Sequence, residues 1–425
     1  MMHLLLLSVL SYAGLIYSPP QHVQKVVMVI SMAYLSKLHI YRMVFDYGGY
    51  ILDITGPIMI GTQKVTSLAF SLHDGTGRQE EELSQEQKRY AVRKKPTAIE
   101  FFSYLLSFQT LMCGPLVYFT DYIEFITGTN FEKAKEESRR KSIEYQRPSP
   151  TKAVLYKLMT STIFAILVLV LVPLIPTESL ADDSFIRRNP LHMYLLYTIL
   201  STSAARFKYF FAWTLGETIC NASGLGFSGY RPDGSPEWEL VSPVSIWELE
   251  TSLNFKVLLD NWNKTTQRWL KSCAYDRCPP SIRTLATYVL SAMWHGFYPG
   301  YYCCFLTATF ITTGARNGRR YIRPLFQGSV FASRVYDVIT FCLTRAFLAY
   351  AVAPFCLLSL EASIKFYSAS YYWGHILAIS GCLLPYVMKP PPRQSTSSSS
   401  KTASSNGQKE DTITTSEQDH VKKIE

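Results

Sequence analysis

Apolar residues are arranged along this chain in long runs that short polar segments separate. Runs without a charged residue cover residues 1–24, 101–120, 158–177, 189–205, 346–360 and 366–388. Several of them reach the roughly 20 residues that a helix needs to cross a bilayer core. The short alternating segments of a membrane β-barrel are not found. We therefore expect an all-α fold, a polytopic transmembrane helical bundle in which about 8 to 10 helices cross or enter the membrane.

The longest uncharged run, residues 284–315, reads TLATYVLSAMWHGFYPGYYCCFLTATFITTGA. It exceeds one simple membrane crossing, and it is interrupted at Gly296 and again at Pro299 and Gly300. We therefore predict two helices that meet at a break. His295 lies beside this break, deep in the apolar run, where an ionisable side chain is costly and is by default a candidate for function.

The remaining pattern predicts further elements. Residues 26–45 form a second apolar segment, 79–96 a polar loop or surface helix, and 132–151 an exposed charged loop. Within residues 50–75, Asp53 and Lys64 are placed in apolar surroundings and Gly56-Pro57 interrupts the pattern. These two charges either pair or reach the membrane interface, or they form a wall of a polar chamber.

Residues 221–271 are too polar to span a membrane for most of their length. Their end, residues 259–270, carries Leu259, Trp262 and Trp269 among polar residues. This pattern predicts an amphipathic helix at the membrane surface or at the mouth of a chamber.

Composition supports a membrane protein. Of the 425 residues 48% are hydrophobic and 17% are charged, and the net charge is +10. The basic residues cluster in short loops: Lys88, Arg89, Arg93, Lys94, Lys95; Lys133, Lys135, Arg139, Arg140, Lys141; Arg316, Arg319, Arg320, Arg323. The positive-inside rule places such loops on the cytosolic face, so the charge indicates topology and no nucleic-acid partner.

Targeting and processing signals modify this picture at both ends. Residues 1–18 lack the basic start and the cleavage site of a signal peptide, which favours a retained helix or half helix. From residue 389 onward the chain is rich in Pro, Ser and Thr, and we expect a disordered cytosolic tail over residues 389–425. Lys422 and Lys423 match a dilysine retrieval pattern, which favours the endoplasmic reticulum membrane.

Cysteine and histidine spacing argues against a metal centre. The nine cysteines are scattered and contain no C-x-x-C pair, so no zinc site or disulfide framework is expected. No other histidine stands three or four residues from His295. A neutral imidazole away from bulk water is instead suited to taking a proton from a hydroxyl group. The alternative is a structural histidine that is hydrogen-bonded to a neighbouring helix.

Asn263 is the second candidate. It stands between Trp262 and Trp269, and its amide can donate a hydrogen bond to a developing oxyanion or orient a substrate carbonyl. Two other interpretations remain open. Asn263-Lys264-Thr265 and Asn221-Ala222-Ser223 match the glycosylation sequon. Asn263 is also a good helix-capping residue.

The two candidates occur together in a recognisable joint motif. W-N-x-x-T-x-x-W-L from Trp262 is followed by S-A-x-W-H-G-x-x-P-G-Y-Y from Ser291. This pair resembles the membrane-bound O-acyltransferase family, and within it the lysophospholipid acyltransferases. D-I-T-G-P-x-M-I-x-T-Q-K-V-T-x-L-A-F at residues 53–70, H-D-G at 73–75, K-Y-x-F-A-W at 208–213 and G-F-S-G at 226–229 are similar to the same group.

The resemblance implies a helical chamber in which Asn263 and His295 face each other. Acyl-CoA is the expected co-substrate, a lysophospholipid the expected acceptor, and no cofactor is implied. His295 is implied as the general base on the glycerol hydroxyl and Asn263 as a polarising group. Five residues are expected to contact substrate: Trp262, Thr266, Trp294, Tyr301 and Lys64. The branch of the family that this chain most resembles acts on lysophosphatidylethanolamine and lysophosphatidylserine.

Family members of this type carry further hydrophobic helices before the point where this chain begins. We therefore expect residues 1–388 to form one acyltransferase membrane domain with a shortened N-terminus. Three alternatives stay open: acyl transfer to diacylglycerol, a sterol or a protein; a transporter or channel with His295, Asp53 and Lys64 along a polar pathway; and a catalytically silent scaffold. No internal repeat of the kind common in transporters is found.

Overall fold

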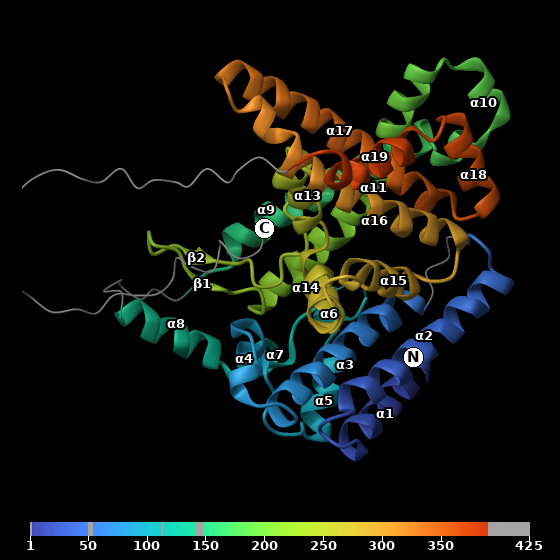
Figure 1. The fold of residues 1–425 in the computed structure, drawn as a ribbon. Helices are drawn as coiled ribbons and strands as arrows, with labels where there is room; N and C mark the ends of the chain where they lie inside the picture. Colours follow the sequence, from blue (N-terminus) through green and yellow to red (C-terminus); the bar gives the residue numbers. More distant parts are fainter. Residues whose placement is uncertain (1, 50–53, 113, 141–147, 390–425) are drawn as a thin grey trace, which may run out of the picture. The chain divides into compact units, whose positions relative to one another are not determined.

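Helices form nearly all of the secondary structure, and Figure 1 shows their order in a computed structural model of the chain. The structure describes residues 2–49, 54–112, 114–140 and 148–389. A single two-stranded hairpin is found among these residues. The all-α class predicted from the apolar runs is confirmed. The described residues belong to one compact unit that ends at Lys389, and the predicted tail lies outside them.

Three long helices begin the chain: α1 (Met2–Tyr17), α2 (Val23–Phe45) and α3 (Thr55–Thr76). Pro19 and Pro20 separate α1 from α2 because proline cannot continue a helix. Pro57 lies in the first turn of α3, where its missing N–H costs nothing. The predicted interruption at Gly56-Pro57 is therefore the start of a helix. Asp53 lies outside the described residues.

Short helices follow: η1 (Glu80–Glu82), α4 (Gln85–Tyr90), α5 (Ala98–Leu105), α6 (Phe108–Leu111) and α7 (Phe119–Thr127). Thr97 and Glu100 form a capping box that starts α5, and the hydrogen bonds from Thr97 lower the pKa of the Glu100 carboxyl. The uncharged run at residues 101–120 is thus divided among three helices, so it does not form one crossing helix. Gly114 and Pro115 lie between α6 and α7.

The charged segment predicted as a loop contains most of a helix, α8 (Thr129–Arg140), so that prediction is wrong for residues 132–140. Its charged side chains suit an exposed helix, which the search for apolar periodicity missed. The chain continues through α9 (Thr151–Leu174), η2 (Thr177–Ala181), α10 (Asp183–Arg188) and α11 (Leu191–Ser223).

The polar region after α11 contains the hairpin and short helices. Its elements are β1 (Gly229–Tyr230), β2 (Pro236–Glu237), α12 (Ile246–Glu250), α13 (Phe255–Asp260), α14 (Lys264–Cys273) and η3 (Tyr275–Arg277). β1 and β2 are antiparallel, with Gly229 opposite Glu237. The single amphipathic helix predicted at residues 259–270 is wrong. A turn at residues 261–263 divides it into α13 and α14.

The C-terminal helices are α15 (Arg283–His295), α16 (Pro299–Tyr321), η4 (Arg323–Phe326), α17 (Val330–Leu357), α18 (Leu360–Ala369) and α19 (Trp373–Val387). The two helices predicted for residues 284–315 are confirmed as α15 and α16, with the break where Gly296 and Pro299 stand. The uncharged run at residues 366–388 is instead shared by α18 and α19.

Among the residues that the structure describes, three stretches are long and apolar enough to cross a membrane: α2, the continuous stretch Thr151–Ala181, and α17. The apolar helices α1 and α19 are shorter. Only 6% of the most apolar window of Thr151–Ala181 is buried inside the protein, so this helix presents its side chains outward, as a lipid-facing span requires. The chain is an integral multi-pass membrane protein. The expected total of about 8 to 10 membrane helices stays a prediction.

One face of α3 holds the two helices that carry the candidate residues. The indole N–H of Trp294 in α15 donates to the carbonyl oxygen of Met59 at 2.9 Å. One turn further along α3, Gln63 Nε2 donates to Thr266 Oγ1 in α14, also at 2.9 Å. α3 therefore contacts both α14 and α15 through hydrogen bonds that are buried or partly buried.

The same face continues along α3 at positions three or four residues apart. Trp269 Nε1 donates to Thr66 Oγ1 at 2.9 Å. Arg277 stacks over Phe70, and its guanidinium binds both carboxylate oxygens of Asp74, at 2.8 and 2.6 Å. These contacts attach α14 and η3 along the length of α3.

A second cluster attaches α11 to α17. Glu250, the last residue of α12, accepts hydrogen bonds from Arg206 of α11 at 2.9 Å and from Arg345 of α17 at 3.0 Å. Arg345 also donates to Ser252 Oγ. Because one carboxylate joins the buried Arg206 and the partly buried Arg345, α11 and α17 are held at fixed positions around it.

We expect Asp74→Asn to destabilise the protein. Asp74 is buried, and its loss of charge leaves the bidentate Arg277 contact incomplete, which costs about 2 kcal/mol. The thermal unfolding midpoint in detergent measures this loss. Asp183→Asn is the matched control, because Asp183 pairs with Lys365 on the surface and such pairs contribute about 1 kcal/mol or less. Equal shifts for the two variants would contradict the role given to Asp74.

Candidate active site

His295 is the last residue of α15, and the next residue explains why the helix ends there. Gly296 has φ +130° and ψ −164°, a conformation that residues with a side chain rarely adopt. Its N–H still donates to the carbonyl oxygen of Ala292 at 3.0 Å. Pro299 then begins α16 with its preset φ. The break thus places His295 at the corner between two helices.

Aromatic rings surround the His295 imidazole. Phe305 stacks on it with centroids 5.3 Å apart, and Phe355 of α17 meets it edge-on at 5.1 Å. Tyr301 lies 6.0 Å away and stacks on Phe355 at 4.3 Å. The imidazole is half-buried, and its nitrogens form no hydrogen bond with any residue that the structure describes. Within that part of the chain, the alternative of a histidine bonded to a neighbouring helix is not found.

A second histidine approaches the same corner. His39 of α2 is buried, and its Nε2 lies 3.0 Å from the carbonyl oxygen of Trp294. His39 does not stand at metal-ligand spacing from His295, and it belongs to no predicted site. No local pattern signals the contact, because 255 positions separate the bonded residues.

Asn263 begins α14 from a left-handed conformation, with φ 47° and ψ 56°. Its Oδ1 accepts a hydrogen bond from the Thr266 N–H at 3.3 Å, so it caps the helix. The neighbouring N–H of Lys264 donates to the Pro243 carbonyl at 2.7 Å and fixes the turn from outside. Asn263 therefore caps the helix, as one of the alternatives predicted. The hydrogen bond from the Thr266 N–H uses only the oxygen of its side-chain amide.

Trp262 belongs to an aromatic group on α11. It packs edge-on against Trp213 at 4.9 Å and against Tyr209 at 5.8 Å. Trp294 packs between His295 and Trp269, and the centroid of its ring lies 4.7 Å from that of His295 and 5.8 Å from that of Trp269.

Six of the seven predicted residues lie in two groups that α3 connects. One group is Trp262, Asn263 and Thr266, and the other is Trp294, His295 and Tyr301. α3 connects Thr266 to Trp294 through the hydrogen bonds of Gln63 and Met59.

Lys64 differs from the other six in its surroundings, and its predicted substrate contact stays a prediction. The side chain is fully buried, and its ammonium donates to the Tyr104 carbonyl at 2.9 Å, to Ser107 Oγ at 3.0 Å and to the Leu105 carbonyl at 3.4 Å. An ammonium has three donors, and all three bind at the end of α5. Lys64 is therefore a helix-capping residue in this structure.

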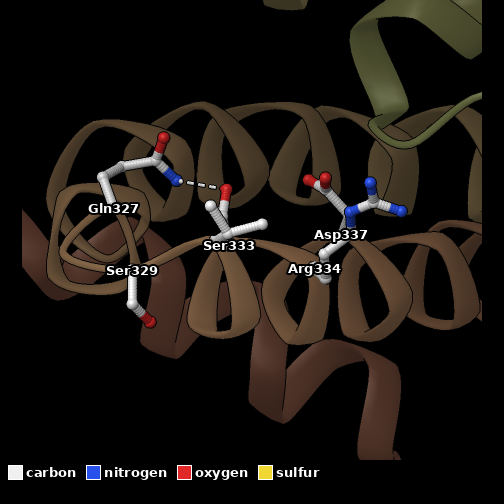
Figure 2. A pocket seen from close by; sticks show the side chains of 6 residues that line it. Gln327, Ser329, Ser333, Arg334 and Asp337 are labelled. Atoms are coloured by element: carbon white, nitrogen blue, oxygen red, sulfur yellow. Dashed lines mark hydrogen bonds between the residues drawn. The ribbon is translucent and has the colours of Figure 1, made fainter.

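Two surface recesses lie apart from His295. Figure 2 shows one at the start of α17, where Gln327 donates to Ser333 Oγ; its remaining lining residues are Ser329, Val330, Arg334 and Asp337. The other lies beside α5 and includes Arg93, Lys94 and Lys95. The predicted site residues line neither recess. Asn221 is fully buried, so its sequon is not accessible for glycosylation in the folded chain.

Comparison with known proteins identifies close relatives. The model of the MBOAT, membrane-bound O-acyltransferase family matches residues 41–359. The chain is 42% identical over 383 residues to "Lysophospholipid acyltransferase 6" of Drosophila melanogaster. The matched region covers 89% of this chain and 53% of the Drosophila protein. It is 40% identical over 381 residues to human "Membrane-bound glycerophospholipid O-acyltransferase 1", covering 89% and 77%.

A third relative is more distant. The chain is 32% identical over 362 residues to "Lysophospholipid acyltransferase" of Schizosaccharomyces pombe, covering 83% of this chain and 70% of the relative. The chain thus spans about half the length of the Drosophila protein and about three quarters of the human one. Asn263 and His295 both lie within residues 41–359, the part of the chain that the family model matches.

We expect Gly296→Ala to lower the unfolding midpoint, because the φ of this position costs a residue with a Cβ about 1 to 3 kcal/mol. The added Cβ would also lie 3.3 Å from the His39 ring. Gly318→Ala is the control: Gly318 is helical, and no atom lies within 4 Å of the Cβ position. Thermal unfolding in detergent should show an unchanged or higher midpoint for Gly318→Ala. A Gly296→Ala midpoint at or above that of wild type would refute the strain argument.

Proposed function

Because the chain belongs to the membrane-bound O-acyltransferase family, we propose that it transfers a fatty acyl chain from acyl-CoA to the free glycerol hydroxyl of a lysophospholipid. The family resemblance inferred from the joint motif is confirmed. Two of the relatives described above carry lysophospholipid acyltransferase in their names, which supports this acceptor class. The observation that carries the proposal is the His295 imidazole, enclosed by aromatic rings yet without a hydrogen bond to the described protein.

His295 acts as the general base. Its neutral imidazole takes the proton of the glycerol hydroxyl while the oxygen attacks the thioester carbonyl of acyl-CoA. The tetrahedral intermediate collapses, the C–S bond breaks, and the imidazolium returns the proton to the leaving thiolate. The products are a diacyl phospholipid and free CoA. Atoms and charge balance without a cofactor or an acyl-enzyme.

Asn263 stabilises the negative charge that develops on the thioester oxygen. Its Oδ1 is occupied by the Thr266 N–H, so the amide nitrogen is the end that remains for substrate. A donor held by a helix cap is preorganised, because it does not have to be ordered during the reaction. The cap and the catalytic role therefore use opposite ends of one side chain.

The aromatic residues supply the walls. Trp262, Trp294 and Tyr301 border the acyl chain and keep water from the thioester, and Thr266 supports the Asn263 turn. We favour lysophosphatidylethanolamine or lysophosphatidylserine as the acceptor, because the motifs resemble that branch. We also propose residence in the endoplasmic reticulum membrane, supported by the dilysine pattern at Lys422 and Lys423. Imaging against a marker of that membrane tests this location.

We expect His295→Ala to reduce acyl transfer by about 10²- to 10⁴-fold, the usual contribution of a general base. Microsomes that express the full chain receive labelled acyl-CoA and a panel of lysophospholipids. His192→Ala is the control, because His192 is exposed on α11 and should leave the rate unchanged. Equal rates for His295→Ala and wild type would exclude His295 as the base. The labelled product identifies the headgroup.

A pair of variants separates the two roles of Asn263. Asp is as good an N-cap as Asn and also tolerates the left-handed conformation, but it lacks the amide donor. We therefore expect Asn263→Asp to retain the unfolding midpoint while acyl transfer falls about 10²- to 10³-fold, the loss of one oxyanion donor. Asn263→Ala should lower both the unfolding midpoint and the rate of acyl transfer. A fully active Asn263→Asp enzyme would leave Asn263 with the cap alone.

A further inference from the structure

We propose that His39 is a positioning residue for His295: it holds the end of α15 by a hydrogen bond, so that the imidazole of His295 keeps its place against Phe305 and Phe355. The inference rests on the proposed function, in which His295 is the reacting base. It assigns a part in the reaction to α2, a helix that precedes the catalytic helices by more than two hundred residues.

The direction of the hydrogen bond follows from its partner. The Trp294 carbonyl can only accept, so Nε2 of His39 carries the proton and donates across 3.0 Å. Trp294 lies in the last turn of α15, where carbonyl oxygens lack a partner within the helix. His39 is 8% exposed, so this bond forms away from water. The histidine therefore satisfies a buried carbonyl immediately before His295.

The His39 ring also fits the turn that follows. A Cβ placed on Gly296 would lie 3.3 Å from both Cγ and Nδ1 of His39. The imidazole of His39 thus lies close to the backbone at the residue after His295, and the glycine makes this approach possible. His39 contacts the chain on both sides of His295, at Trp294 and at Gly296.

The segment after α2 contacts Tyr298, which lies in the break between α15 and α16. The Gly48 N–H donates to the Tyr298 hydroxyl at 3.1 Å. Tyr47 packs edge-on against the Tyr298 ring at 4.9 Å. The corner between α15 and α16 is therefore held at two points by α2 and the residues that directly follow it.

This arrangement matters for rate because general-base catalysis requires the imidazole within hydrogen-bond reach of the hydroxyl. Aromatic rings surround His295 but supply no hydrogen bond to fix it. Its orientation must therefore come from the backbone, and His39 contacts that backbone directly. A displacement of about 1 Å at such a site costs on the order of 10²-fold in rate.

Two variants of His39 test the proposal in the full chain, purified in detergent. His39→Leu keeps the bulk and removes the donor, whereas His39→Gln keeps an N–H near the position of Nε2. His22→Gln is the control, because His22 is an exposed residue at the start of the same helix and forms no side-chain cap. Hydrogen–deuterium exchange of the peptide covering residues 290–297 reports the helix end, and labelled acyl-CoA turnover reports kcat and KM.

We expect His39→Leu to speed exchange of this peptide about tenfold and to lower kcat by about 10- to 100-fold, with KM within about twofold. His39→Gln should restore most of the protection and of kcat, and His22→Gln should match wild type. A general loss of folding would accelerate exchange in every peptide, which separates it from this local effect.

Two results would overturn the proposal. One is unchanged protection of residues 290–297 together with unchanged kcat in His39→Leu. The other is a His39→Gln protein that is fully protected yet as inactive as His39→Leu, since the ring itself would then take part in chemistry. A wild-type protein that transfers no acyl group would contradict the proposed function. If His39→Leu still loses exchange protection at residues 290–297, the hydrogen bond from His39 to α15 would be supported even so.

Discussion

Polar groups that leave water must find partners inside the protein, and α3 meets this requirement for the helices of the site. Its carbonyl and side-chain oxygens accept hydrogen bonds from Trp294 and Trp269, and Gln63 donates to Thr266. Each of these bonds is costly to break because an unpaired buried donor or acceptor retains its desolvation penalty. α14 and α15 therefore cannot shift independently along α3. The placement of Asn263 and of His295 depends on this one helix face.

Within that frame, the His295 imidazole differs from the groups that hold the helices of the site in place. The indole N–H groups that contact α3 have hydrogen-bond partners, and the Lys64 ammonium uses all three of its donors. The side-chain oxygen of Asn263 accepts a hydrogen bond. The His295 imidazole has rings around it and no hydrogen bond within the described chain. In the mechanism that we propose, this imidazole is the base that accepts the proton of a substrate hydroxyl.

Local sequence rules predicted the elements that rest on composition and on helix-breaking residues. The break between α15 and α16 follows from Gly296 and Pro299, since glycine permits the left-handed corner and proline starts the next helix. The same rules were wrong where a turn needed distant support. Residues 261–263 carry no proline or glycine, and their turn is stabilised by the Pro243 backbone, which accepts from Lys264. α8 was missed because it carries charge rather than an apolar stripe.

The sequence by itself determined the helical class, the membrane setting and the two residues with suitable chemistry, because apolar run length and side-chain type are local properties. Only the tertiary structure decided how these residues are held. The Lys64 ammonium turned toward α5, since the free carbonyls at the end of that helix were the acceptors within its reach. His39 became part of the site because α2 packs against α15. Contacts between residues 255 positions apart depend on packing in space, and no spacing along the chain encodes them.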